Sequence, residues 1–120
     1  MILTESSKLS KTLRNNVIDI LDLLGDYEAQ KDYANKVSDY IAIQEMICMW
    51  FDDNYNPDSS NFIKGFSDNE LAMLKDFNDY YNSISDSLPK DNIRTLQINE
   101  NWEKLIGKAR ILKDKIKNAT

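Results

Sequence analysis

The sequence of 120 residues predicts an all-α fold, a single-domain four-helix bundle that occupies residues 1–120. Apolar residues recur at spacings of three and four over four long segments, as the buried face of a helix requires. Glycine and proline, with three and two residues, are too scarce for a fold with many tight turns. No segment alternates apolar and polar residues long enough to predict a strand.

The first two predicted helices span residues 5–24 and 27–51, on either side of Gly25. The second is the most apolar of the four, and residues 40–51 are apolar on more than one side. A helix with this pattern is buried on several faces, so we expect it to be central.

The third predicted helix starts at residue 67, where Ser67 and Glu70 form an S-x-x-E capping box. Its apolar stripe continues to Leu88, and Pro89 ends it because proline cannot continue a helix.

The fourth predicted helix covers residues 100–118, with Asn99 as its cap and lysines in its last turns, where cations suit the helix dipole. Residues 91–98 form either a loop or a short extra helix, anchored by Ile93 and Leu96.

A long acidic and aromatic loop is predicted between the second and third helices. The stretch WFDDNYNPDSSNF, residues 50–62, holds three acidic residues, three asparagines and four aromatic residues. It begins like an EF-hand loop, but Pro57 replaces the glycine and Ile63 replaces the bidentate glutamate that calcium binding needs. Two interpretations stay open: the aromatic residues fold inward as a small core beside solvated turn residues, or the stretch forms a recognition surface.

The charge of −5 is distributed unevenly along the chain. Residues 52–91 carry nine acidic and three basic residues, whereas residues 92–120 carry three acidic and seven basic residues. An acidic middle segment disfavours nucleic acid and favours a basic protein partner. With one cysteine, no apolar run of membrane-spanning length and no signal-peptide pattern, we expect a cytoplasmic protein without a membrane partner.

The residue inventory argues against catalysis. The chain has no histidine, and Cys48 has no cationic neighbour in the sequence to activate it. The three glycines cannot build a phosphate-binding loop. We therefore expect no enzymatic activity, no cofactor and no metal site.

Exposed acidic and aromatic residues form the predicted partner-binding site. Asp79, Asn82 and Asp86 share one side of the third helix, opposite its apolar stripe. If the preceding loop packs near that side, its carboxylates and tyrosines would complete a surface for lysine and arginine. The predicted contact residues are Asp52, Asp53, Tyr55, Asp58, Asp76, Asp79, Tyr80, Asn82 and Asp86.

Three segments, WFDDNYNP from residue 50, FSDNELAMLKDFNDYY from residue 66 and SLP from residue 87, resemble small helical immunity proteins of bacterial polymorphic toxin systems. The nearest groups are those of contact-dependent inhibition and of colicin-type nucleases. An S-x-x-E-L helix with a Phe-Asn-x-Tyr/Phe turn and a Leu-Pro end, followed by a final helix led by Trp102, looks like that group. The resemblance covers roughly residues 45–112.

The resemblance implies a cytoplasmic antitoxin that binds one basic toxin domain, a nuclease, and covers its active-site face with acidic groups. No residue matches a fixed toxin-contact motif, so the contact residues rest on charge alone. Two other classes stay open: a regulatory or structural helical module that self-associates through the apolar end of the second helix, and an enzyme that uses carboxylates and a divalent metal.

Overall fold

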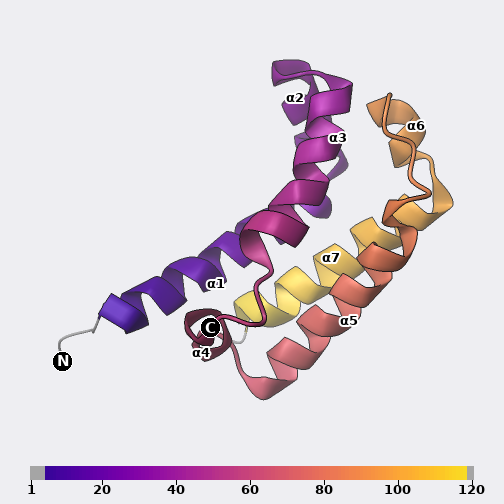
Figure 1. Cartoon of the computed structure of the whole chain (residues 1–120). Coiled ribbons are helices and arrows are strands. Elements are labelled where there is room, and N and C mark those ends of the chain that lie inside the picture. Colours follow the sequence, from indigo (N-terminus) through magenta and orange to yellow (C-terminus); the bar gives the residue numbers. More distant parts are fainter. Residues whose placement is uncertain (1–4, 119–120) are drawn as a thin grey trace.

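Three long helices form the body of the protein. A computed structural model describes residues 5–118, and α1 (Glu5–Leu24), α5 (Asp68–Ser85) and α7 (Glu100–Asn118) lie along one another in it, with α7 in contact with both others (Figure 1). Their ranges confirm the sequence prediction for α1 and α7. The capping box confirms the start of α5, because the Ser67 hydroxyl accepts from the Glu70 N–H and the Glu70 carboxylate accepts from the Ser67 N–H. All regular elements of the described residues are helical.

The predicted second helix is in fact two helices. α2 (Tyr27–Lys36) ends before Val37, and α3 (Asp39–Cys48) begins after Ser38, so that the two fold back on each other at one end of the molecule (Figure 1). Ser38 starts the new helix because its hydroxyl accepts a hydrogen bond from the Ile41 N–H, at 3.2 Å. The prediction of one helix over 27–51 was wrong because apolar periodicity continues through this cap.

The predicted long loop is mostly helical. A π-helix, η1 (Met49–Asn54), continues directly from α3, and a short helix, α4 (Ser60–Lys64), follows. Ser59 caps α4 by accepting from the Phe62 N–H, at 3.3 Å. Only residues 55–59 separate the two elements, so the described residues contain seven α-helices and η1 rather than four helices joined by a long loop.

The segment left open between the third and fourth predicted helices forms a helix. α6 (Ile93–Gln97) starts at Asn92, whose side chain accepts from the Thr95 N–H, at 3.1 Å. Leu96 is fully buried and Ile93 is half-buried, as expected of anchors. α6 packs against α2 and α3, so these three helices cover one end of the long helices, while α4 packs against α1 nearer the other end (Figure 1).

A single hydrophobic core joins all of these elements. The fully buried aromatic residues Trp50, Phe62, Tyr81 and Trp102 come from η1, α4, α5 and α7. Burying side chains of this size is the main source of stability in a domain of this length, because each removes a large apolar area from water.

A polar network ties the core together near the α2–α6 end. Gln30 is fully buried, and its side-chain oxygen accepts from the Trp102 Nε1–H and the Gln97 Nε2–H, both at 3.1 Å. Its amide nitrogen donates to the carbonyls of Leu23 and Leu24. The network satisfies polar groups that would otherwise be buried without partners.

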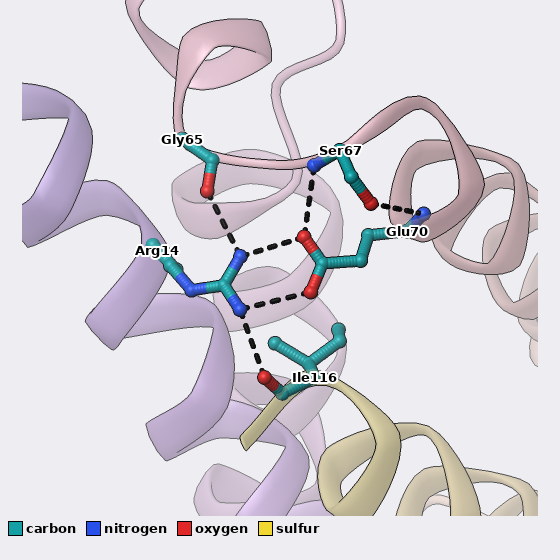
Figure 2. A network of polar contacts seen from close by, with 5 residues as sticks. All are labelled: Arg14, Gly65, Ser67, Glu70 and Ile116. Atoms are coloured by element: carbon teal, nitrogen blue, oxygen red, sulfur yellow. Dashed lines mark hydrogen bonds and ion pairs between the residues drawn. The ribbon is translucent and has the colours of Figure 1, made fainter. Parts of the chain in front are cut away.

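A second network lies at the opposite end of α7. The Arg14 guanidinium binds both carboxylate oxygens of Glu70 at 2.8 Å and donates to the carbonyls of Gly65 and Ile116, at 3.0 and 2.8 Å (Figure 2). One side chain therefore joins α1 to the α4–α5 connection and to the last turn of α7. The planar fork of arginine matches a carboxylate in this two-bond geometry.

Candidate functional site

The aromatic side chains of the WFDDNYNPDSSNF stretch pack inward. Trp50 is fully buried, its ring stacks on Tyr55 with centroids 5.1 Å apart, and its edge meets Phe77 of α5. The Trp50 Nε1–H donates to the Asn78 side chain at 3.1 Å, which fixes η1 against α5. Tyr55 meets Phe62 edge to face, at 5.8 Å. Of the two interpretations, the inward-folded aromatic core is therefore what the structure shows for these side chains.

The aspartates next to these aromatic residues stay at the surface. η1 buries Trp50, whereas Asp52 and Asp53 of the same element are both exposed. Burial raises the pKa of the Cys48 thiol, and the charges of Asp52, Glu45 and Asp53 raise that pKa further. Cys48 is the last residue of α3, so its thiol lies where α3 meets η1.

The exposed row on α5 belongs to the helix against which η1 packs. Asp79, Asn82 and Asp86 are all exposed, as their spacing predicts. Burial raises the pKa of Tyr55, and the Asp79 charge raises it further while Lys75 opposes the effect. Tyr55 stacks on Trp50, whose ring in turn meets Phe77, so the segment after η1 lies near α5.

Asp79 has one cationic neighbour within its own helix. Lys75 contacts its carboxylate at 2.8 Å, and both side chains are more than half exposed. This hydrogen bond lowers the pKa of Asp79, so the carboxylate is ionised at neutral pH. An exposed pair of this kind contributes little to stability and does not keep either charge from a partner.

Asp76 and Tyr80 face a different direction. The Tyr80 hydroxyl donates to the Asn101 carbonyl at 3.3 Å, and the Lys108 ammonium lies 4.8 Å from its ring centre. Asp76 borders a hollow beside Lys108 and Lys115 of α7. The structure therefore places these two predicted contact residues next to the basic last helix, apart from the outward row of Asp79 and Asp86.

We call the remaining predicted residues the acidic surface. They lie on η1, on the segment after it and on the outward side of α5, and all are exposed except the half-buried Tyr55: Asp52, Asp53, Tyr55, Asp58, Asp79, Asn82 and Asp86. The exposed Glu45 lies one helical turn before η1 on α3, and the part-buried contact of Asn78 with Trp50 holds η1 against α5. Neither residue was predicted, because both roles depend on how α3 and η1 pack against α5, which periodicity along one helix does not show.

Residues 5–118 show neither a metal centre nor a membrane span. No three acidic or cysteine side chains among them are arranged to hold a metal ion. Within the same range, no helix combines the length and the hydrophobicity needed to cross a bilayer.

Comparisons of the chain with protein-family models, with curated proteins and with solved structures found no match.

Proposed function

We propose that this protein is an immunity protein, a cytoplasmic inhibitor without chemistry of its own that neutralises a cognate toxin domain. The toxin would be a basic nuclease whose active-site face is covered by the acidic surface. The observation that carries the proposal is the packing of η1 on α5, where the Trp50 Nε1–H donates to Asn78 and the Trp50 ring meets Phe77. This packing holds η1, which carries the exposed Asp52 and Asp53, against the helix that carries the exposed Asp79. The resemblance of the α5 segment to helical immunity proteins supports the same class.

The arrangement suits the recognition of a cationic, nucleic-acid-binding cleft. The carboxylates would occupy the positions of backbone phosphates and pair with lysine or arginine of the toxin, each through charge-assisted hydrogen bonds. Tyr55 is held by Trp50 and Phe62, so little side-chain entropy is lost when it is covered. The negative charge of these carboxylates would also attract the basic toxin and speed its association at low salt.

The test uses the C-terminal domain of any secreted protein encoded directly upstream of this chain. Co-expression of that domain should stop the growth of a bacterial host, and the wild-type chain should restore it. In calorimetry, Asp79→Lys/Asp86→Lys should weaken binding at least about tenfold, since each reversal turns an attraction into a repulsion. Thermal unfolding should remain cooperative, because both side chains are exposed.

A matched control is available on other faces of the molecule. Asp32→Lys/Glu103→Lys makes the same change of charge at exposed positions of α2 and α7 and should leave the affinity unchanged. Undiminished affinity in the Asp79/Asp86 variant would show that the toxin binds elsewhere on the molecule. Failure of the wild-type chain to bind or protect would reject the immunity proposal.

A self-associating helical module is the second candidate. Val37, Tyr40 and Ile41 gather at the turn between α2 and α3 and are 41%, 56% and 45% exposed, which is high for apolar side chains. A mass that rises with concentration in sedimentation equilibrium, and that Tyr40→Ser/Ile41→Ser returns to the monomer, would favour this candidate.

A further inference from the structure

An apolar groove lies between α5 and α7. It is a hollow of about 300 Å³ with Phe77 and Leu112 at its base and Met73 beside them. Ile111 lies at its edge and is 60% exposed, on a helix whose other apolar side chains are buried. A large aliphatic side chain exposed next to an apolar hollow is typical of a binding surface.

The rim of the groove is basic. Lys108 and Lys115 border it on either side of Ile111, and Lys104 lies one turn before Lys108 on the same side of α7. None of these three lysines forms a salt bridge with any residue of the described chain. Asp76 is the one acidic side chain among the lining residues, so positive charge dominates.

We infer that this α5–α7 groove binds an acidic amphipathic helix of a partner protein. Lys108 and Lys115 are two helical turns apart, roughly 10 Å along the axis, with Ile111 between them. A partner helix with carboxylates seven residues apart and an apolar residue midway would pair with both lysines and cover Ile111 and Met73. The groove differs from the acidic surface in position and sign of charge, so the inference does not rest on the proposed function.

The charge of the groove distinguishes this occupant from the proposed toxin. A basic nuclease domain would be repelled by Lys104, Lys108 and Lys115, whereas an acidic helix would be attracted. With both surfaces in use, the protein would hold a cationic partner on η1 and α5 and an anionic partner on α7.

Peptide display tests the inference without knowledge of the natural partner. Random peptides roughly 16 residues long, enough for four helical turns, would be selected on the wild-type protein and counter-selected on Lys108→Glu/Lys115→Glu. We expect enrichment of Asp or Glu flanking a Leu, Ile or Phe. One enriched peptide, labelled with fluorescein, would then be titrated by fluorescence anisotropy, and its affinity should fall as salt is raised.

Four variants assign the binding to the groove. Lys108→Glu/Lys115→Glu should weaken binding at least about tenfold, and Ile111→Ser should weaken it several-fold while leaving the unfolding midpoint unchanged. Lys11→Glu/Lys64→Glu makes the same charge change on α1 and α4 and should keep wild-type affinity. Asp79→Lys/Asp86→Lys should also keep peptide binding, which separates this site from the acidic surface.

Several results would overturn the inference. Selection that yields no binder, binders without acidic residues, or binders that tolerate the lysine reversals would each reject an acidic helix as the occupant. Concentration-dependent self-association that Ile111→Ser abolishes would assign the groove to a second copy of the chain instead.

Discussion

At the scale of single residues, Arg14 is the charged side chain with the most hydrogen bonds to other elements, and its loss should strongly affect stability. Its side chain is 14% exposed, that of Glu70 is 7% exposed, and the guanidinium also satisfies two backbone carbonyls. A buried pair of this kind gains little over an apolar pair, but loss of one partner leaves a buried charge without compensation.

We therefore predict that Arg14→Met destabilises the protein by about 3–5 kcal/mol. The Glu70 carboxylate would lose both hydrogen bonds from Arg14 and keep the one from the Ser67 N–H, and the carbonyls of Gly65 and Ile116 would each lose the bond from Arg14. Urea denaturation followed by circular dichroism measures this change in the free energy of unfolding. Arg94→Met, which removes an exposed arginine of α6, should stay within about 0.5 kcal/mol of the wild type. Equal losses in the two variants would contradict the role given to the buried pair.

The lowered pKa of Glu70 predicts how the stability of the protein depends on pH. The hydrogen bonds from Arg14, followed by those from Ser67, hold the pKa of Glu70 below its ordinary value of 4.5 in the folded state. A lowered folded-state pKa means that the unfolded state binds more protons, so the contribution is complete above pH 4.5 and is lost as the pH falls through the folded-state pKa.

Denaturation curves between pH 7 and pH 3 check this dependence. The wild type should lose stability below about pH 4.5, while Glu70→Gln, which is less stable at pH 7, should lose less over the same range. The difference between the two proteins should therefore shrink as the pH falls. A difference that is constant with pH would show that Glu70 does not titrate abnormally.

Glu70 also shows which contacts could be predicted from the sequence and which could not. Ser67 and Glu70 are three residues apart, so the capping box was predicted and confirmed. Arg14 is 56 residues from Glu70, and nothing in the pattern around either residue indicates the other. The contact of Glu70 with Ser67 in the capping box was therefore predictable, whereas its tertiary contact with Arg14 was not.

At the scale of elements, the same distinction explains which helices were predicted. α1, α5 and α7 each have one continuous apolar stripe, from which the ranges of α1 and α7 follow. α5 starts as predicted but ends at Ser85, before the predicted end at Leu88 and Pro89, because the buried Leu88 continues the apolar stripe beyond the helix. The break at Ser38 replaces only one turn of helix, and the apolar residues on both sides keep their spacing. α4 has five residues, fewer than two turns, so it has too little periodicity to detect.

Two glycines provide a matched test of these helices. A Cβ on Gly107, within α7, would meet no atom within 4 Å, whereas a Cβ on Gly65 would lie 2.8 Å from the Ser10 carbonyl oxygen of α1. We predict that Gly107→Ala raises the free energy of unfolding by roughly 0.5–1 kcal/mol, because alanine favours helix. Gly65→Ala should lower it by more than about 1 kcal/mol, because α1 and α4 must separate.

Chemical denaturation of the two variants tests whether alanine is excluded at Gly65 by the lack of space or by the backbone conformation. Gly65 has helical backbone angles, with φ at −78°, so alanine is excluded there by the neighbouring helix and not by backbone geometry. Stabilisation by Gly65→Ala would show that α1 and α4 are less tightly packed than the structure indicates.

At the scale of the whole molecule, the packing of helices decides which charges lie together. The row of Asp79, Asn82 and Asp86 was predicted because helical spacing fixes it. The separation of Asp76 and Tyr80 was not predicted, because it depends on the position of α7 beside α5. The acidic surface therefore lies on η1 and α5, whereas the lysine-rimmed groove lies between α5 and α7 and includes Asp76.

The two buried polar networks occupy different ends of this body and should contribute independently. Arg14 and Leu24, whose carbonyl accepts from Gln30, are ten residues apart on α1, or about 15 Å. Mutations separated by more than about 10 Å without shared partners are usually additive within about 0.5 kcal/mol. We predict that Glu70→Gln combined with Gln97→Met lowers the free energy of unfolding by the sum of the two single losses. Both substitutions keep side-chain volume, which limits cavity effects.

Parallel urea titrations, followed by tryptophan fluorescence and by far-ultraviolet circular dichroism, measure this additivity. Trp50 and Trp102 report on the core, while circular dichroism reports on all helices. Coincident curves are expected, because one continuous hydrophobic core links both ends and should unfold in a single transition. Separate transitions would show that the α2–α3–α6 end unfolds as its own unit, and a double-mutant loss well below the sum would show that the networks are coupled through α1 and α7.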